Sequence, residues 1–367
     1  MTNQPLLQSI VQKLVSFRTV TGERKEVEKA YRYIQSLYRG LPVQVKKFTR
    51  NGFTSQILFF KSSGWRKPKV LLNAHIDVVP SQAKGVFQPK VSQGKLYARG
   101  ASDMKGPLAA FLVAMREAVS LPSLPSVALL ITSEEETGGE NGAEYAVEAL
   151  HMRPQFVING DGAHNPWVVL TKARGVLWVE LVARGKSAHG ARPWLGENAV
   201  EKAMKAIERI QAFIGPGKPS IWKTSVNLSW IEAPNRTANM VPDMARAVLD
   251  IRFTDDLAKT PEELLARLQK IVPQVKLSIV KKAPLVLTDE KNRFVQDFSK
   301  TVKRVTNQKV VYGFDEGATD ARFFAEKNIP AVVIGAGGGD RHGDKEWVSL
   351  KNVHLVKDIV MQFLKDL

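Results

Sequence analysis

The chain has 367 residues, more than one hydrophobic core usually holds, so we expect two domains. Hydrophobic residues make up 44% and charged residues 24%, which is typical of a folded globular protein. There is no cysteine, which excludes disulfides and thiolate ligands, so any metal must bind His, Asp or Glu. The net charge is +17, but Lys and Arg are scattered and no nucleic-acid-binding module accompanies them. A solvated basic surface is the favoured interpretation, with steering of anionic substrates as the secondary one and no nucleic acid partner.

The apolar segments of the sequence match neither a signal peptide nor a membrane-spanning helix. Residues 1–16 lack the core of a signal peptide, because Gln, Ser and Lys interrupt their apolar residues. No apolar run approaches the roughly 20 residues that span a bilayer. The sequence therefore predicts a cytoplasmic protein without a membrane partner.

Two helices followed by three strands are predicted at the start of the chain. Apolar residues at helical spacing predict a helix over 4–18, and a second helix follows the turn at 21–23. Two strands joined by an Asn-Gly turn are predicted at 43–48 and 56–60. A buried strand at 70–73 comes next.

The strand at 70–73 leads directly into His75 and Asp77. A buried strand brings its last residues to the carboxyl edge of a parallel sheet, where open α/β folds place their chemistry. Residues two apart point the same way in an extended chain, and an imidazole backed by a carboxylate is a typical metal ligand. Taken alone, the pair is explained equally well by an ordinary strand-to-loop turn.

Further carboxylates appear where other predicted elements begin or end. Asp103 lies ahead of a helix predicted over 107–119, where an N-cap role is the alternative. Three glutamates follow a strand at 127–132, and an aspartate follows a strand at 156–158. The candidates that arrive from separate segments are His75, Asp77, Asp103, Glu135, Glu136 and Asp161. A cluster of oxygen and nitrogen ligands with shared carboxylates suits two divalent metal ions.

A self-contained pattern occupies the middle of the chain. Strand, helix, strand, strand, helix and strand are predicted at 176–184, 197–214, 225–230, 245–253, 261–271 and 275–280. This βαββαβ order forms a compact α/β sandwich. We therefore expect an inserted domain at 174–286, with 1–173 and 287–367 together forming the other domain.

The remaining elements complete the first domain. They are predicted as a helix at 291–306, a strand at 310–312, a short helix at 319–327, a buried strand at 331–334 and a closing helix at 350–367. The glycine-rich loop after residue 334 fits neither a P-loop nor a dinucleotide fingerprint. Its glycines are better explained by a backbone that passes close to a site and presents His342.

Four motifs, followed by His342, resemble those of the M20 metallopeptidase family. They are AHIDVVP at 74–80, GASDMKG at 100–106, EEETG at 134–138 and SAHG at 187–190. That family includes deacetylases, desuccinylases, aminoacylases, a carboxypeptidase and dipeptidases. The resemblance covers nearly the whole chain. It implies a zinc-exopeptidase-like α/β catalytic domain with a mixed central sheet, plus an inserted ferredoxin-like βαββαβ lid and dimerisation domain.

The resemblance also implies a site for two divalent metal ions, zinc or alternatively cobalt. Asp103 would bridge both ions, with His75 and Asp161 on one ion and Glu136 and His342 on the other. Glu135 would be the general base for a metal-bound water, and Asp77 would orient His75. The peptide bond that follows Asp103 is expected to be cis.

The chemistry of amide hydrolysis gives an independent reason for the adjacent glutamates. Zinc lowers the pKa of bound water to about 7, and a neighbouring carboxylate can pass the water's proton to the leaving amine. Because Glu135 and Glu136 are adjacent, one can bind metal while the other remains free. Glu134 is expected to be a solvated charge.

Other site residues are expected in the inserted domain. His189 resembles the lid histidine that reaches the partner's active site in dimeric members, so we expect a catalytic role for it and a homodimer. Asn239 and Arg252 resemble residues that hold a substrate carboxylate, a task that suits a guanidinium, and Arg174 is a third candidate. A surface histidine and structural caps or surface charges are the alternatives.

The expected activity is metal-dependent removal of an acetyl or succinyl group from an N-acyl amino acid. The alternative enzyme is a dipeptidase or carboxypeptidase that cleaves short peptides at the same metals. Ala318 stands where desuccinylases carry threonine, so strict desuccinylase identity does not follow. A protein that binds metabolites without hydrolysing them is the hypothesis from another class.

Overall fold

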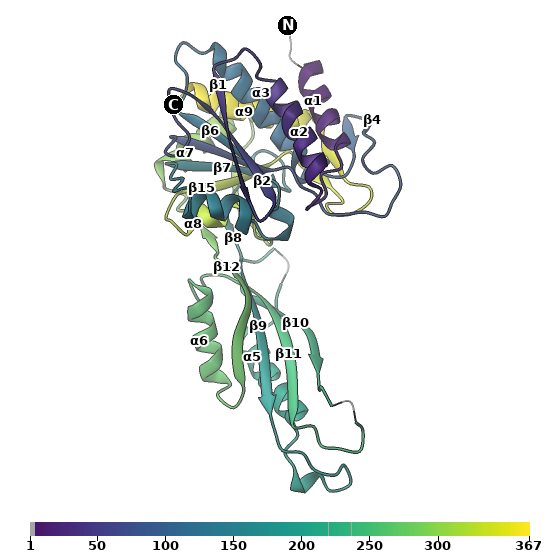
Figure 1. The fold of residues 1–367 in the computed structure, drawn as a ribbon. Helices are drawn as coiled ribbons and strands as arrows, with labels where there is room; N and C mark the ends of the chain where they lie inside the picture. Colours follow the sequence, from purple (N-terminus) through teal and green to yellow (C-terminus); the bar gives the residue numbers. More distant parts are fainter. Residues whose placement is uncertain (1–3, 219, 236) are drawn as a thin grey trace. The chain divides into compact units, whose positions relative to one another are not determined.

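The computed structural model describes residues 4–218, 220–235 and 237–367, which form two compact units (Figure 1). The first unit contains the chain up to Lys172 with residues 287–313 and 319–367, and the second contains residues 173–286 and 314–318. Residues 314–318, which we expected in the first domain, join the second unit because Phe314 packs against Trp222, with ring centroids 5.3 Å apart.

The first unit is built on a mixed sheet, as the fold prediction stated. Along the sheet the strands are β1 (Val43–Arg50), β2 (Phe53–Phe60), β6 (Val127–Thr132), β3 (Val70–His75), β7 (Phe156–Gly162), β15 (Ala331–Gly335), β8 (Val168–Ala173) and β13 (Val286–Leu287), and β14 (Val311–Asp315) pairs with β8. The four central strands β6, β3, β7 and β15 are parallel, and antiparallel strands flank them. β6 and β3 are buried along their full length, as near-continuous apolar runs predict.

Helices cover this sheet. They are α1 (Gln4–Ser16), α2 (Arg24–Ser36), α3 (Gly106–Glu117), α4 (Tyr145–Glu148), α7 (Arg293–Thr306), α8 (Ala321–Ala325) and α9 (Leu350–Lys365). α3 packs on β3 and β7 and against α1 and α9, and every residue from Gly106 to Met115 is buried. A helix that is apolar on all sides is stable only inside a core, which explains its position.

The first unit also contains a small antiparallel sheet. Its strands run in the order β16 (Gly338–Gly339), β17 (Trp347–Ser349), β5 (Lys95–Tyr97) and β4 (Lys90–Ser92). The pairing of β5 with β17 places Tyr97 opposite Trp347 and so brings the segment before Asp103 next to the segment after His342, which lies far away in the sequence.

The second unit has the expected βαββαβ order. Its antiparallel sheet runs β10 (Ser225–Glu232), β11 (Met244–Phe253), β9 (Gly175–Arg184) and β12 (Lys276–Ala283), with helices α5 (Ala199–Ile214) and α6 (Pro261–Ile271). Burial alternates along β9 and β11, and their buried side chains form one core with the two helices. Asn198 and Thr260 cap the helices through their side chains.

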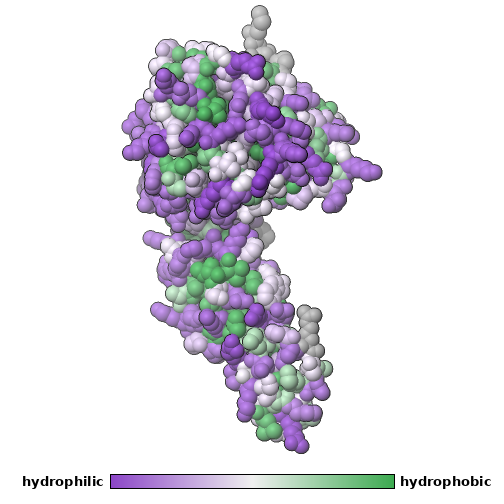
Figure 2. Space-filling model, in the orientation of Figure 1, coloured by the Kyte–Doolittle hydropathy of each residue, from purple (hydrophilic) through white to green (hydrophobic). Residues whose placement is uncertain are grey.

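The surface agrees with the charged composition. Hydrophilic side chains cover most of the face of the first unit that is drawn in Figure 2, with scattered apolar residues between them. Among the described residues, no helix combines the length and the apolar character that crossing a membrane requires.

Candidate di-metal site

Parallel strands bring the candidate ligands to one edge of the sheet. His75 is the last residue of β3 and pairs in register with Thr132, the last residue of β6. Glu135 and Glu136 follow β6 in a short turn of 3-10 helix, Glu135–Thr137. Asp161 lies at the end of β7, the other neighbour of β3. The carboxyl ends of adjacent parallel strands therefore meet here, as in other open α/β sheets.

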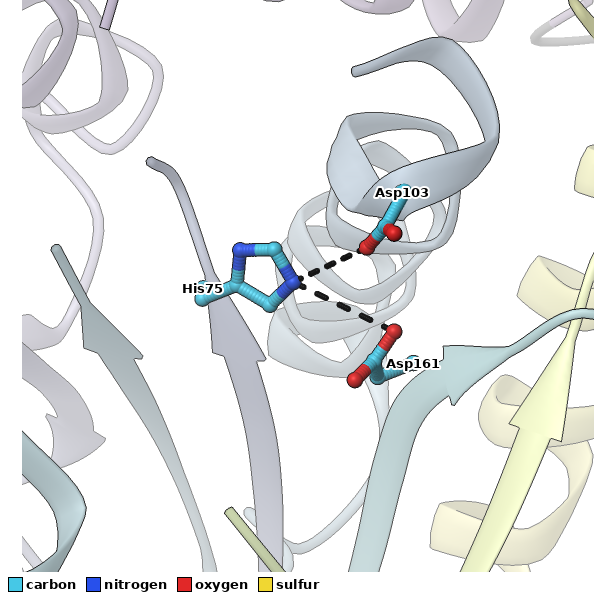
Figure 3. Close-up of side chains that lie close together, drawn as sticks. All are labelled: His75, Asp103 and Asp161. Atoms are coloured by element: carbon cyan, nitrogen blue, oxygen red, sulfur yellow. Dashed lines mark hydrogen bonds and ion pairs between the residues drawn. The ribbon is translucent and has the colours of Figure 1, made fainter. Parts of the chain in front are cut away.

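His75, Asp103 and Asp161 form the first group of potential ligands (Figure 3). The His75 Nε2 atom lies 3.1 Å from Asp103 Oδ1 and 4.0 Å from Asp161 Oδ1. All three side chains are buried. Both carboxylates face the same ring nitrogen, which is the arrangement expected around a shared cation.

Asp103, Glu136 and His342 form the second group. The His342 Nε2 atom lies 3.2 Å from Asp103 Oδ2 and 3.2 Å from Glu136 Oε2. Asp103 thus belongs to both groups and turns one oxygen towards each. The peptide bond between Asp103 and Met104 is cis, as the family resemblance implied. Asp103 does not cap α3, whose N-cap residue is Lys105.

Asp77 connects the histidine to the turn that carries the glutamates. Its backbone carbonyl lies 3.0 Å from His75 Nδ1, and its Oδ1 atom lies 3.5 Å from the same nitrogen. The two carboxylate oxygens accept hydrogen bonds from the backbone N–H groups of Glu135 and Glu136, each at 3.2 Å. A partner on Nδ1 leaves Nε2 free to face a metal.

Both groups fit divalent metal ions. In each group the potential ligand atoms lie within 4.8 Å of one another, and they are imidazole nitrogens and carboxylate oxygens, which suit zinc and cobalt. Burial, reinforced by the charge of Asp161, raises the pKa of Glu135 well above its usual value. A cation bound here would offset this concentration of negative charge.

The carboxylates of the site favour the protonated forms of the two histidines. Burial lowers the pKa of His75, but its hydrogen bonds to Asp103 and Asp77 outweigh this and raise the pKa well above its usual value. Hydrogen bonds to Asp103 and Glu136 raise the pKa of His342 to about 10. Without metal, both imidazoles therefore hold protons that a metal ion would displace.

Glu135 belongs to neither ligand group, which leaves its carboxylate available for proton transfer. Its Oε1 atom lies 3.9 Å from Nη1 of Arg322, and both side chains are largely buried. Arg322 also donates from Nη2 to the backbone carbonyl of Gly138, so it contacts the turn at two points. The sequence reasoning did not identify Arg322 as part of the site.

Glu134 differs from the expectation of a solvated charge. It is 2% exposed, and its Oε2 atom accepts a hydrogen bond of 2.8 Å from the backbone N–H of Asn141. The turn folds back on itself, as the 3.0 Å bond from Gly139 N to the Glu134 carbonyl shows, and carries the side chain inwards. Burial raises the pKa of Glu134 to about 7.

Arg341 is a second cation that the sequence reasoning missed. Its Nη1 atom lies 3.3 Å from both Asp161 Oδ1 and the Asp161 carbonyl, and its Nη2 atom donates to the Ser102 carbonyl at 3.2 Å. The adjacent His342 marked this loop in the sequence, but no spacing showed which partners Arg341 would take.

The expected lid residues all lie in the second unit. His189 is exposed, and the backbone of Asn239 accepts a hydrogen bond from Gly190 N at 2.7 Å. Arg252 is paired with Asp250 through two hydrogen bonds of 2.9 and 3.1 Å. Arg174 is buried and donates to the Ile221 carbonyl at 2.8 Å. Both guanidinium groups therefore have protein partners.

The fold and the two ligand groups together define a metal-dependent hydrolase of amide bonds. The model of peptidase family M20/M25/M40 matches residues 71–366, and the chain belongs to this family. It is 26% identical to a succinyl-diaminopimelate desuccinylase from Wolbachia pipientis wMel over 97% of this chain and 92% of that protein.

Solved structures share the fold. A tripeptidase from Staphylococcus aureus superposes with a TM-score of 0.79 at 19% identity, covering 100% of this chain and 99% of that one. A dinuclear metal-binding peptidase of the M20 family from Bacillus subtilis gives a TM-score of 0.71 at 17% identity, covering 99% and 98%. Two ligand groups that share an aspartate agree with the dinuclear centres of this family.

Proposed function

We propose that the enzyme removes an acyl group of the acetyl or succinyl type from an N-acyl amino acid at a two-zinc centre. The observation that supports this most directly is the sharing of Asp103 between two ligand groups beside a glutamate that belongs to neither. His75 and Asp161 would complete one zinc site, and Glu136 and His342 the other. Cobalt suits the same set of ligands.

The chemistry requires a proton to travel from water to nitrogen. Bound zinc ions would lower the pKa of a water molecule and polarise the amide carbonyl. Glu135 accepts the water proton, the hydroxide oxygen forms a bond to the acyl carbon, and the C–N bond breaks as Glu135 delivers the proton to the amine. Its buried carboxylate is suited to holding that proton, and Arg322 and Asp77 fix the turn that carries it.

The choice of an N-acyl amino acid as substrate rests on the relatives that cover almost the whole chain. Those from Wolbachia pipientis and Rickettsia felis are succinyl-diaminopimelate desuccinylases, at 26% and 24% identity. The second candidate is cleavage of short peptides, which the names of two similar structures favour, a tripeptidase and a metallo-carboxypeptidase. Both activities would use the same metals and the same base.

Homodimerisation is also part of the proposal, and the geometry of the second unit supports it. Arg252 lies at one end of β11, opposite Val176, whereas His189 and Asn239 lie beyond the other end, where Met244 pairs with Arg184. The ten residues of β11 span roughly 30 Å, so these residues cannot hold one small substrate from a single chain. His189 and Asn239 would serve the partner's substrate, while Arg252 and Arg174 serve their own.

Exposed apolar residues in the second unit are suited to such an interface. Trp194, Met204 and Trp230 are 75%, 51% and 44% exposed, and Figure 2 shows apolar patches on the face of this unit that it draws. A monomeric mass at full activity would contradict the role of His189 in the partner's site. A cytoplasmic location stays a prediction.

The test is amine release from a panel of N-acetyl and N-succinyl amino acids and of dipeptides, with and without added zinc or cobalt. We expect metal-dependent turnover confined to one acyl class. Glu135→Ala should lose turnover but retain both metal ions. Glu117→Gln, which alters an ion pair between α3 and α9, is the control and should retain turnover as well as both metal ions. Turnover of dipeptides alone would favour the peptidase, and unchanged turnover in Glu135→Ala would remove Glu135 as the base.

A further inference from the structure

We propose that Arg99 and Glu346, a buried ion pair outside both ligand groups, position two of the metal ligands, Asp103 and His342. The Arg99 Nη1 atom lies 3.1 Å from Glu346 Oε2, and both side chains are almost completely buried. The inference rests on the ligand assignment proposed above. It goes further, because it assigns the geometry of the shared aspartate and of one histidine to two residues that touch no metal.

Glu346 holds the loop that ends in Asp103. Its Oε1 atom accepts hydrogen bonds from the backbone N–H groups of Ser102 and Asp103, at 2.8 and 3.0 Å. Its Oε2 atom accepts a third, from the N–H of Gly100 at 2.8 Å. One carboxylate thus satisfies three backbone donors of a buried segment. The position of the Asp103 backbone follows from that of Glu346.

Arg99 extends the same pair to His342. Its Nη2 atom donates a 3.0 Å hydrogen bond to the backbone carbonyl of His342. The His342 side chain is 56% exposed, so packing around the ring contributes little to its position. Its backbone has φ +62°, a conformation that residues other than glycine rarely adopt. A bond to the carbonyl is therefore well placed to determine where the imidazole points.

The pair is not needed to hold the two segments together. Backbone pairing already joins β5 and β17, with Tyr97 opposite Trp347, and Ala98 N donates to the Glu346 carbonyl at 3.0 Å. The charged side chains act beyond the end of this ladder, where the chain leaves the sheet towards the ligands. A purely structural ion pair would have no reason to contact the backbone of one ligand through its anion and that of another through its cation.

The two residues predict different losses. Of the two ligands, Arg99 bonds directly to His342 and reaches Asp103 through Glu346, so Arg99→Lys should weaken chiefly the site formed by Asp103, Glu136 and His342. Glu346 contacts the shared Asp103, so Glu346→Gln should weaken both sites. Loss of a residue that orients a ligand typically costs roughly 10- to 100-fold in metal affinity, which is the size we expect.

The chosen variants separate these effects from unfolding. Lysine keeps the positive charge of Arg99 but lacks the planar fork whose two nitrogens reach two acceptors. Glutamine keeps the shape of Glu346 but replaces one acceptor oxygen with a donor. Glu117→Gln is the matched control, because Glu117 is paired with Lys357 at 3.2 Å in the same unit and belongs to neither ligand group.

The experiment is a Co²⁺ titration of the metal-free full chain, followed by calorimetry and by visible absorption of the bound ion. His342→Ala identifies which binding event belongs to the second group. Arg99→Lys should weaken chiefly that event, and it should cause little further loss in the His342→Ala background. Glu346→Gln should weaken both events, whereas Glu117→Gln should match the parent.

Two results would overturn different claims. If His342→Ala binds two cobalt ions as the parent does, the ligand assignment fails. If His342→Ala loses one event but Arg99→Lys and Glu346→Gln bind cobalt like the parent, the ion pair is only structural and this inference fails. Should Glu346→Gln not fold, Arg99→Lys decides the question alone, because equal weakening of both events in that variant also contradicts the role assigned to Arg99.

Discussion

Gly139 offers a sharp test of what holds the turn at residues 134–139, which carries Glu135 and Glu136. Its φ is +77°, and a Cβ added there would lie 2.4 Å from Asp320 Oδ1 and 2.9 Å from Phe323 Cε2. Gly40 has nearly the same φ, +78°, but no neighbouring atom lies within 4 Å of the added Cβ. The two glycines therefore have the same left-handed backbone conformation, but only at Gly139 would an added side chain meet neighbouring atoms.

The expected free energies follow from this difference. An alanine in the left-handed region costs roughly 1–2 kcal/mol, and the reduced entropy of the unfolded chain offsets about 0.4–1 kcal/mol. Gly40→Ala should therefore destabilise the protein by about 1 kcal/mol or less. Gly139→Ala should cost a further 1–3 kcal/mol, roughly, because Asp320 and Phe323 are buried and must shift.

The same shift should reach the catalytic groups. Glu135 and Glu136 lie in the turn that Gly139 closes, and a displacement of about 1 Å can cost roughly 100-fold in rate. Urea unfolding and kcat of both alanine variants measure the two effects. Equal stability and equal turnover in Gly139→Ala and Gly40→Ala would refute the claim that Asp320 and Phe323 hold this turn.

Three other predictions address charge, pH and packing. Arg322→Met should lower kcat at least about 10-fold while cobalt content is retained, because the base loses the cation that positions it, and loss of cobalt instead would contradict that role. Because the pKa of His342 is about 10 without metal and only the neutral ring binds metal, cobalt affinity should rise with pH up to that value, with proton release measurable by calorimetry in two buffers; binding without proton release would contradict it. Phe298→Ala should cost about 3–5 kcal/mol in urea unfolding, because its ring packs on Phe156 and Phe363, and a change below 1 kcal/mol, roughly, would contradict that packing.

Much of the site could be predicted because each candidate ligand follows a local signal. His75 and Asp161 end buried parallel strands, and such strands place their ends at one edge. The residues that arrange them could not be predicted in the same way. Arg99 and Glu346 are 247 positions apart, and only the pairing of two three-residue strands brings them together. No periodicity in the sequence encodes such a contact.

Helices and strands are also predicted well where local patterns determine them, and less well where a distant contact does. The βαββαβ order of the second unit follows from period and turn signals, and its helix at Pro261–Ile271 has the predicted bounds. The short helix predicted at 319–327 is limited to Ala321–Ala325, and the strand predicted at 310–312 runs from Val311 to Asp315. Both departures occur near residues 314–318, where Phe314 packs against Trp222, a residue that is distant in the sequence but lies in the same unit.

Asp77 explains how a ligand and a base can be adjacent in sequence and still have separate roles. Its two carboxylate oxygens accept hydrogen bonds from the N–H groups of Glu135 and Glu136, one each, and these bonds fix the backbone of both residues. Thr21 donates to the same carboxylate at 2.8 Å and holds it in place. Since the side chains of consecutive residues leave the backbone in different directions, Glu136 reaches His342 while Glu135 faces Arg322. The carboxylate that also contacts His75 therefore ties one metal ligand to the residue that moves the proton, and a change at Asp77 should disturb both together.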